Sequence, residues 1–220
     1  MGVTRHLERN APDSDEATRK YRRLAAVYDR RIRFVAPIRR RVIDLLRLQP
    51  GEHELDMGCG TGASFAALRE AVGPTGRVTG VELSEEMAAV ACARITDQGW
   101  DNVDVVVGDA TQAPLPSDVD AVLFFLVHDL MRLPRVVERA VAAGRVGAGV
   151  VAFGAVRATH RLALPVNLIV KTIARRYVTT FEGFDAPWSY LAESVPDLSL
   201  QRALAGGVYI ASGQIGREAD

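Results

Sequence analysis

The chain has 220 residues, of which 48% are hydrophobic and 25% are charged, and its formal net charge is zero. This length predicts one domain with room for a modest additional segment, and the hydrophobic content is sufficient for a sizeable core. A net charge of zero argues against an attraction of the whole protein to nucleic acid. Two cysteines, Cys59 and Cys92, are too few for a disulfide framework or a structural zinc site. We therefore expect a reducing, cytoplasmic setting and no metal.

The chain shows neither a secretory signal nor a membrane span. Its first twenty residues are polar and charged, without the apolar stretch of a signal peptide. The longest apolar run, 121–127, has seven residues, whereas a membrane-spanning helix needs about 20. The sequence predicts a protein that is soluble or that rests on a membrane surface.

In chain order, residues 1–16 are predicted to form a flexible tail, and residues 17–48 an N-terminal helical segment. The first helix is expected to start at residue 17 and to carry its larger apolar residues on one face: Tyr21, Leu24, Ala25 and Tyr28. A second helix is predicted over 36–48, because Pro50 and Gly51 follow it as a strong breaker pair.

From residue 49 onward, predicted strands and helices alternate. Strands are expected at 54–57, 77–83, 103–107, 119–126 and 149–156, and helices at 64–72, 85–97 and 133–143. Alternation with near-continuous apolar strands predicts a parallel sheet covered by helices on both faces. A largely apolar helix is expected at 162–180. Two short strands, 198–204 and 208–212, flank Gly206-Gly207 and predict a closing antiparallel hairpin.

The most informative motif is Asp56-Met57-Gly58-Cys59-Gly60-Thr61-Gly62, between a predicted strand and a predicted helix. Glycines let the backbone turn sharply and let a ligand approach without meeting a Cβ atom. The following helix presents free N–H groups, so the loop predicts a site for a polar, nucleotide-like cofactor at the carboxyl edge of the sheet. Taken alone, the loop also fits the dinucleotide pattern through Gly58, Gly60 and Ala63.

Three acidic residues at successive strand ends separate these alternatives. Asp56 precedes the glycines, where a carboxylate suits a ligand with an ammonium group and repels a pyrophosphate. Glu82 ends the next strand and could accept hydrogen bonds from ribose hydroxyls, as in NAD enzymes and methyltransferases. Asp109 follows the third strand and could accept a hydrogen bond from an adenine amino group. Each acid alone could be a solvated loop residue, but the three together favour a nucleoside cofactor with an ammonium group.

The motifs ELDMGCGTG, VELSEEM, GDA and DAVLFFLVHDL resemble the successive motifs of class I S-adenosylmethionine-dependent methyltransferases. The resemblance runs from about Tyr21 to the final hairpin. It implies an α/β, Rossmann-like, doubly wound sheet of seven strands in the order 3-2-1-4-5-7-6, with the last strand antiparallel. It also implies S-adenosyl-L-methionine as the cofactor, held by Asp56, Gly58, Cys59, Gly60, Gly62, Glu82, Leu83, Met87, Asp109, Ala110 and Phe125. Within this set the amino acid part would lie on the glycine loop, the ribose on Glu82 and the adenine beside Asp109.

The segment from Tyr21 to Asp29 is similar to the Y-x-x-x-A-x-x-Y-D stretch of the quinone-methylating and phosphatidylethanolamine-methylating types. In such proteins this helix often folds over the cofactor as a lid, which would bring Tyr21 and Tyr28 to the methionine part. Alternatively, the two tyrosines only pack the helix onto the body. The resemblance divides the chain into a lid over 17–48 and a methyltransferase domain over 49–220, with an insertion at about 157–197.

Candidate catalytic residues follow the fourth predicted strand. His128 is suited to act as a general base on a hydroxyl, because an ordinary histidine has a pKa of about 6.5, and Asp129 is the second candidate. His128 could instead cap the next helix, and a neutral amine acceptor would need neither residue. In the insertion, Trp188 and Tyr190 could line a substrate wall, or they could anchor a short helix. His128 could also contact the substrate.

The charge pattern suggests the kind of acceptor. Residues 17–41 contain ten basic residues against the single acid Asp29, and residues 151–180 contain five basic residues and no acid. A basic, apolar helix can rest on an anionic membrane or receive an amphiphilic substrate. We expect a hydrophobic small molecule as the acceptor, which can also carry an anionic group and is methylated on O or N. A peripheral contact of the protein with a membrane stays open. The alternative is that these helices are ordinary solvated faces.

Three other functions remain open at this stage. An NAD-dependent dehydrogenase would share the glycine loop, but no clear catalytic domain follows it. A protein of the same fold could bind the cofactor without methyl transfer and act as a cyclase, scaffold or sensor. RNA methylation is weaker, because no catalytic tetrad or RNA-binding appendage is present, and we expect no nucleic-acid partner.

Overall fold

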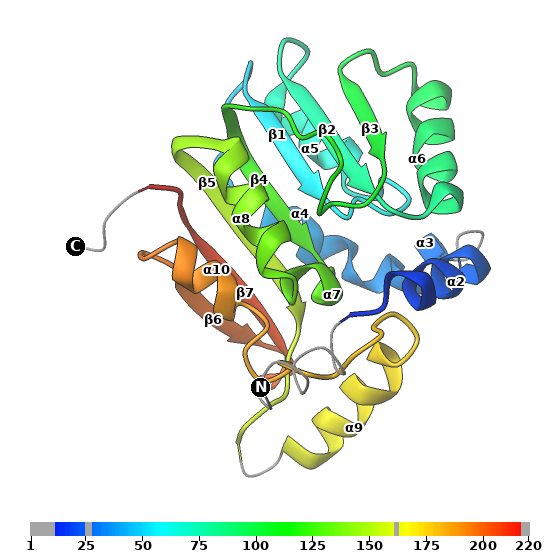
Figure 1. The fold of residues 1–220 in the computed structure, drawn as a ribbon, viewed down its shortest axis with the longest axis vertical. Coiled ribbons are helices and arrows are strands. Elements are labelled where there is room, and N and C mark those ends of the chain that lie inside the picture. The colour runs from blue at the N-terminus through cyan, green and yellow to red at the C-terminus, as the bar shows by residue number, and fades with distance from the viewer. Residues whose placement is uncertain (1–11, 25–27, 161–162, 217–220) are drawn as a thin grey trace, which may run out of the picture.

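The computed structural model describes residues 12–24, 28–160 and 163–216. Most of residues 1–16, the side chain of Leu24 and the whole of Ala25 therefore lie outside the described part of the chain, so the predictions for them are not addressed. The remaining elements form a layered α/β structure in which one sheet is covered by helices on both faces (Figure 1).

The sheet has the strand order β3-β2-β1-β4-β5-β7-β6. The five strands β1 to β5 run parallel to one another, whereas β7 pairs antiparallel with both β5 and β6. The strand order and the antiparallel last strand confirm the predicted fold class. The strands are β1 (His53–Met57), β2 (Arg77–Glu82), β3 (Val103–Val107), β4 (Val119–Phe125), β5 (Gly144–Ala155), β6 (Ser199–Ala203) and β7 (Val208–Gln214).

Two apolar cores hold the helices against the two faces of the sheet. One core packs α4 (Ala36–Asp44), α5 (Phe65–Val72) and α6 (Glu85–Gln98) onto one face. The other packs α7 (His128–Met131), α8 (Pro134–Ala143) and α10 (Ser189–Ser194) onto the opposite face. Four further elements lie toward the carboxyl ends of the parallel strands (Figure 1): α2 (Ser14–Leu24), α3 (Tyr28–Ile32), η3 (Arg33–Val35) and α9 (Ala163–Ala174). Among the described residues, no helix is long and apolar enough to cross a membrane.

Several boundaries differ from the predicted ones. Helix α2 begins at Ser14, so residues 14–16, predicted to belong to the flexible tail, are helical. Helix α4 ends at Asp44, because the chain tightens after it and then reverses at Arg47, whose φ is 55°. Strand β5 begins at Gly144, five residues early, because Gly144 pairs with Val119 before the register shifts. Helix α9 ends at Ala174 and not at residue 180, since residues 177–179 are held by contacts to other elements.

Candidate functional site

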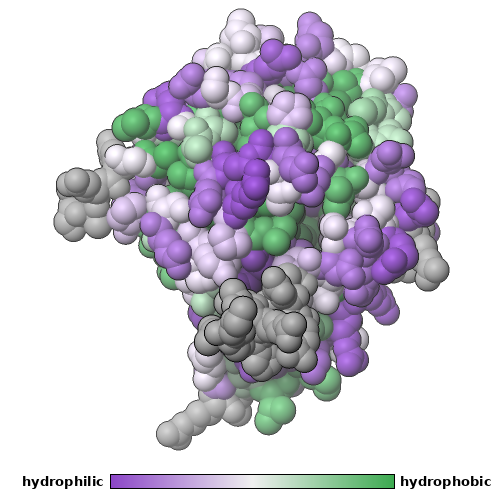
Figure 2. Space-filling model, viewed as in Figure 1, coloured by the Kyte–Doolittle hydropathy of each residue, from purple (hydrophilic) through white to green (hydrophobic). Residues whose placement is uncertain are grey.

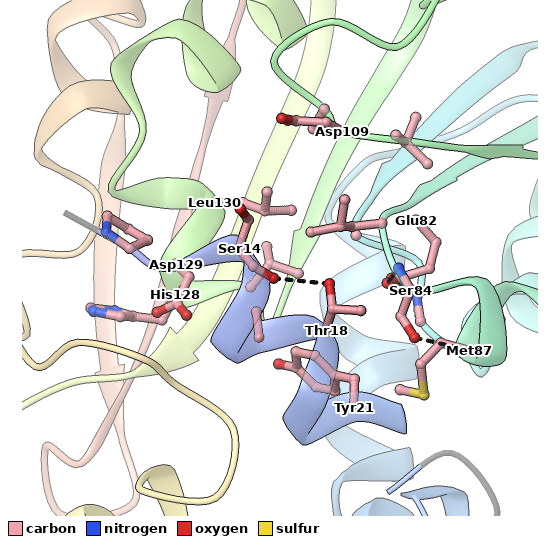
Figure 3. A pocket seen from close by; sticks show the side chains of 18 of the residues that line it. Ser14, Thr18, Tyr21, Glu82, Ser84, Met87, Asp109, His128, Asp129 and Leu130 are labelled. Atoms are coloured by element: carbon pink, nitrogen blue, oxygen red, sulfur yellow. Dashed lines mark hydrogen bonds between the residues drawn. The ribbon is translucent and has the colours of Figure 1, made fainter. Parts of the chain in front are cut away.

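A cavity of about 260 Å³ opens at the carboxyl ends of the parallel strands (Figure 3). Its floor is formed by the glycine loop after β1, and its walls by the segments that follow β2, β3 and β4. Helix α2 and the loop after α9 close the remaining side. Of the predicted cofactor residues, the cavity is lined by Tyr21, Tyr28, Gly58, Gly60, Glu82, Leu83, Met87, Asp109, Ala110 and Phe125. The structure therefore brings these ten residues together at one cavity, and their contact with a cofactor stays a prediction.

The glycine loop needs glycine for two different reasons. Gly58, Gly60 and Gly62 all have positive φ values, 74°, 58° and 68°, which favour glycine over other residues. At Gly58 a Cβ atom would also lie only 2.6 Å from the side chain of Val127. At Gly60 the nearest atom to such a Cβ, the methyl group of Met87, is 3.6 Å away, so the space above this residue is open. Gly60 thus forms a bare cradle that a ligand can approach closely.

Glu82 joins the glycine loop to the start of α6. Its two carboxylate oxygens accept hydrogen bonds from the backbone N–H of Gly60, at 2.9 Å, and of Ser84, at 2.8 Å. Burial raises the pKa of Glu82, and the backbone donors of Ser84 and Gly60 partly offset this shift. Each carboxylate oxygen retains a second lone pair, so Glu82 can still accept a hydrogen bond from a ligand in the cavity. Ser84 caps α6 by accepting a hydrogen bond from the N–H of Met87 at 3.4 Å.

Asp109 lies in a fixed turn after β3. One of its carboxylate oxygens accepts a hydrogen bond from the backbone N–H of Thr111 at 2.8 Å. Arg139, from α8, donates to the carbonyl oxygens of Ala110 and Ala113 at 2.5 and 2.6 Å and holds the same turn from behind. Asp109 is exposed and lines the cavity, above Glu82 in the view of Figure 3. Its contact with a nucleobase stays a prediction.

Three predicted cofactor residues do not line the cavity: Asp56, Cys59 and Gly62. The side chain of Asp56 lies beneath the glycine loop and is 1% exposed, because strand alternation places it beside Glu54 on the face covered by α4. Burial raises the pKa of Asp56 to about 7, although the charge of Arg39 opposes the shift. Asp56 is thus buried outside the cavity lining in this structure, and its contact with an ammonium group stays a prediction.

His128 and Asp129 stand at the cavity where α7 begins, as predicted. His128 is buried and its ring lies 4.8 Å from the ring of Phe184. Burial lowers the pKa of His128 to about 4, a shift that the nearby backbone of Glu182 partly offsets. The carboxylate of Asp129 instead accepts hydrogen bonds from the N–H and the hydroxyl of Thr179, at 2.9 and 2.8 Å. His128 is thus neutral at pH 7, and Asp129 is engaged in holding a loop.

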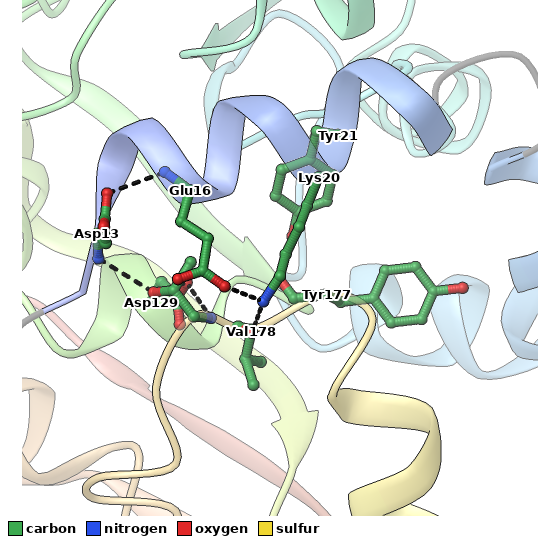
Figure 4. A network of polar contacts seen from close by, with 8 residues as sticks. Asp13, Glu16, Lys20, Tyr21, Asp129, Tyr177 and Val178 are labelled. Atoms are coloured by element: carbon green, nitrogen blue, oxygen red, sulfur yellow. Dashed lines mark hydrogen bonds and ion pairs between the residues drawn. The ribbon is translucent and has the colours of Figure 1, made fainter.

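Helix α2 is fastened over the cavity by what we call the clasp: three hydrogen bonds between α2, with Asp13 before it, and residues 177–179 (Figure 4). The hydroxyl of Tyr21 donates to the carbonyl oxygen of Tyr177 at 3.0 Å. The ammonium group of Lys20 donates to the carbonyl oxygen of Val178 at 2.8 Å. The N–H of Asp13 donates to the hydroxyl of Thr179 at 3.1 Å. Because Thr179 is bound to Asp129, the clasp connects α2 to α7.

The two tyrosines of the N-terminal segment both line the cavity and pack against other rings. The ring of Tyr28 lies 6.3 Å from that of Tyr21 and 5.8 Å from that of Tyr177, in edge-to-face arrangements. Burial raises the pKa of Tyr21 well above its usual value, so its hydroxyl remains a donor for the clasp. The two alternatives for these residues, cavity contact and packing, therefore coexist.

Trp188 and Tyr190 do not line the cavity, which favours the second of their two alternatives, the anchoring of a short helix. The ring of Trp188 packs 4.9 Å from that of Tyr209 on β7, and the guanidinium group of Arg202 lies over it at 5.4 Å. The guanidinium group of Arg132 lies 4.9 Å from the centre of the ring of Tyr190. Both residues adjoin the core beneath α10, so they anchor this short helix and the final hairpin.

Sequence reasoning missed the contact between α3 and the glycine loop. The carboxylate of Asp29 binds the hydroxyl of Thr61 and the guanidinium group of Arg94. Arg94, from α6, also donates to the carbonyl oxygen of Gly62 at 3.1 Å. Asp29 ends the Y-x-x-x-A-x-x-Y-D stretch, which is the signal that could have indicated its role, whereas no sequence pattern marks Arg94.

The sequence also yielded no prediction for Arg39, which lies close to the cavity. It is a buried arginine on α4, and its guanidinium group lies 4.7 Å from the centre of the ring of Phe125, which lines the cavity. Burial lowers the pKa of Arg39, and the neighbouring Tyr28 and Asp56 oppose the shift. In the sequence it is one of several arginines in a basic stretch, so nothing distinguishes it as the buried one.

Comparison with known proteins finds similarity to methyltransferases over part of the chain. Residues 55–146 match the family described as a methyltransferase domain. The chain is 38% identical over 96 residues to nocamycin O-methyltransferase from Saccharothrix syringae, which covers 43% of this chain and 34% of that protein. It is 36% identical over 106 residues to demethylmenaquinone methyltransferase from Geobacillus kaustophilus, which covers 46% of this chain and 45% of that protein. The matches thus span less than half of either relative.

Among solved structures, a SAM-dependent methyltransferase from Aquifex aeolicus superposes with a TM-score of 0.57 at 18% identity. The superposition covers 80% of this chain and 89% of the other. At this identity the likeness concerns the fold, and it agrees with the strand order and with the antiparallel last strand.

Proposed function

We propose that this chain is a class I S-adenosylmethionine-dependent methyltransferase that transfers the methyl group of that cofactor to an oxygen or nitrogen of a small hydrophobic molecule. The observation that carries the proposal is the shared cavity. Gly60, Glu82 and Asp109 face it from three successive strand ends. The methyltransferase-domain match over residues 55–146 supports the same cofactor.

The residues of the cavity fit S-adenosylmethionine. Gly60 leaves open space where any other residue would place a Cβ atom, so the backbone can lie against the polar part of the cofactor. Glu82 and Asp109 present carboxylate oxygens at separate points of the wall, where they can accept hydrogen bonds from the ribose hydroxyls and the adenine amino group. Met87 and Ala110 add apolar surface beside them.

When bound, S-adenosylmethionine supplies a methyl group that the positive charge on its sulfur has already activated. The protein's task is then to align the acceptor and to exclude water. The glycine loop and Glu82 fix one side of the cavity through backbone hydrogen bonds. Helix α2, fastened by the clasp, covers the other side and keeps water out.

For a hydroxyl acceptor, His128 is the residue placed to take up the proton. It is neutral because burial lowers its pKa to about 4, and a base this weak contributes less than one with a pKa near 7. We expect His128→Gln to lower kcat by about 10-fold to 100-fold. An unchanged kcat at saturating substrate would remove His128 from the mechanism and would favour a neutral nitrogen acceptor.

The acceptor class is inferred from the apolar part of the cavity. Beyond the polar residues, its wall consists largely of Phe125, Val127, Leu130, Leu133, Tyr177 and Val178. Such a lining suits an aromatic or lipid-like acceptor better than a strongly hydrated one. The relatives named nocamycin O-methyltransferase and demethylmenaquinone methyltransferase support acceptors of this kind.

The proposal is tested with S-adenosylmethionine carrying a labelled methyl group, incubated with the purified protein and panels of quinols, phenols and hydrophobic amines. We expect label to appear in a product that partitions into organic solvent. Cofactor binding without transfer to any extracted metabolite would instead identify a binding protein of the same fold. Binding of NAD in preference to S-adenosylhomocysteine would contradict the proposed cofactor.

A further inference from the structure

Helix α9 presents large apolar side chains to solvent. Leu164, Leu168, Ile169 and Ile173 are 82%, 68%, 60% and 44% exposed, although they belong to one helix of twelve residues. They recur at spacings of four, one and four residues, so they gather on one side of the helix. In Figure 2 the hydrophobic atoms at the lower end of the molecule lie where Figure 1 shows α9. Single exposed apolar residues are ordinary, whereas a cluster of four marks a contact surface.

The same side of the molecule is positively charged. Lys171, Arg175 and Arg176 are exposed on α9 and on the turn that follows it. Within the described part of the chain, no carboxylate forms an ion pair with any of the three. The sequence contains no acidic residue between 151 and 181. The exposed surface of α9 is therefore apolar and cationic at once.

The combination of apolar side chains and cations on α9 indicates which partner covers this surface. A second copy of the chain, docked through the same face in a symmetric pair, would bring the cations of α9 close to those of its partner. The exposed side of one short helix is also small beside the roughly 800 Å² that each partner buries in a stable protein interface. An anionic bilayer instead takes up the apolar side chains and neutralises the cations.

We propose that α9 docks on a membrane surface that contains anionic phospholipids. Residues Tyr177 and Val178, shortly after its last turn, line the cavity and accept the hydrogen bonds of the clasp. The docked helix lies next to the cavity entrance, which α2 covers. A hydrophobic acceptor dissolved in the bilayer is then concentrated next to the site.

The test measures sedimentation of the purified full chain with vesicles of phosphatidylcholine, with or without phosphatidylserine, in the absence of cofactor. We expect binding to the vesicles with phosphatidylserine, weakened by high salt. Leu168→Gln combined with Ile169→Gln should reduce the binding constant about tenfold or more. Arg175→Gln combined with Arg176→Gln should reduce it roughly thirty-fold.

Val146→Gln is the matched control, because Val146 is 78% exposed on β5, outside α9, and its replacement should leave vesicle binding unchanged. All variants should keep the thermal midpoint of the parent chain, since the changed side chains are exposed. Failure of the parent chain to sediment with anionic vesicles would overturn the proposal. So would a dimer in solution that the Leu168→Gln, Ile169→Gln variant dissociates, because a second copy would then be the occupant. As no cofactor or acceptor is present, either outcome leaves the proposed reaction to its own test.

Discussion

At the scale of single residues, the carboxylate of Glu82 connects the parts of the site. It is buried and receives a backbone hydrogen bond from the glycine loop and another from the start of α6. A glutamine in its place presents one amide nitrogen, which would face one of these two N–H groups as a second donor. The geometry of the glycine loop and the acceptor for the cofactor are therefore lost together.

We expect Glu82→Gln to weaken binding of S-adenosylhomocysteine by about 10-fold to 100-fold, which corresponds to the loss of one or two charge-assisted hydrogen bonds. Titration calorimetry measures this change. Glu85→Gln alters an exposed glutamate in the first turn of α6 and should leave the affinity unchanged. Equal affinities for the Glu82→Gln protein and the parent would show that Glu82 serves the loop alone.

His128 should make stability depend on pH in acid. Its pKa is about 4 in the folded protein and about 6.5 in an unfolded chain. Between these values the unfolded state binds more protons, so stability falls as the pH is lowered through this window. The loss attributable to His128 amounts to about 3 kcal/mol by pH 4. Urea unfolding of the parent and of His128→Gln at several pH values measures this difference.

The comparison with His128→Gln is needed because buried carboxyl groups act in the opposite direction. Burial raises the pKa values of Asp56 and Glu82, and such groups favour the folded state as they become protonated. They contribute equally to the parent and to the variant. If both proteins lost stability in parallel from pH 6.5 to pH 4, the burial of a neutral His128 would be refuted.

At the scale of elements, α2 depends on the loop after α9 for its position. The clasp consists of three hydrogen bonds, and two of them end on backbone carbonyl oxygens. Besides the clasp, α2 is attached to α6 by a bond from Arg22 to Glu86 at the surface. An element attached by these few contacts opens more readily than the core helices. It can therefore admit and release ligands without unfolding of the sheet.

Lys20→Met removes one bond of the clasp, together with the ion pair between Lys20 and Glu16 on the same helix, and keeps most of the aliphatic side chain. The net loss of about 1 kcal/mol should speed hydrogen–deuterium exchange of the α2 amides about fivefold and leave the strands unaffected. Arg19→Met is the matched control, because Arg19 is an exposed neighbouring cation that takes no part in the clasp. Equal exchange of α2 in the two variants would show that the Lys20 bond does not hold the helix.

At the scale of the whole molecule, the cavity is built from segments far apart in sequence, so a bound cofactor should stabilise the entire fold. S-adenosylhomocysteine at about 100 times its Kd adds about 2.7 kcal/mol to the free energy of unfolding. For a chain of this size this should raise the Tm by roughly 5–10 °C. Differential scanning calorimetry measures the shift, with NAD at the same concentration as the control. A larger shift with NAD would refute the cofactor assignment.

The sheet could be predicted from sequence because each strand carries its own signal. β3 coincides with its predicted range, since the segment is rich in β-branched residues, and the Gly206-Gly207 turn marked the hairpin. The carboxyl ends of parallel strands meet at one edge, so Glu82 and Asp109 could be assigned to a common site. The burial of Asp56 could have been predicted as well, since strand alternation puts it on the same face as Glu54.

The remaining errors arise from contacts between distant segments. Periodicity predicted helix as far as residue 180, but Asp129 and α2 hold residues 177–179 in another conformation. Trp188 looked like a substrate residue because it is aromatic and lies in an insertion, and only the tertiary structure shows it against Tyr209. No local pattern could have shown that Arg94 reaches the glycine loop.

The clasp has a consequence for how this scaffold could diversify. Lys20 and Tyr21 bind the main chain of residues 177 and 178, so closure over the cavity does not require particular side chains at those two positions. Replacements there would change the shape presented to the acceptor while the fastening of α2 is kept. Libraries restricted to residues 177 and 178 would thus offer a route to new acceptor preferences in a protein that still closes normally.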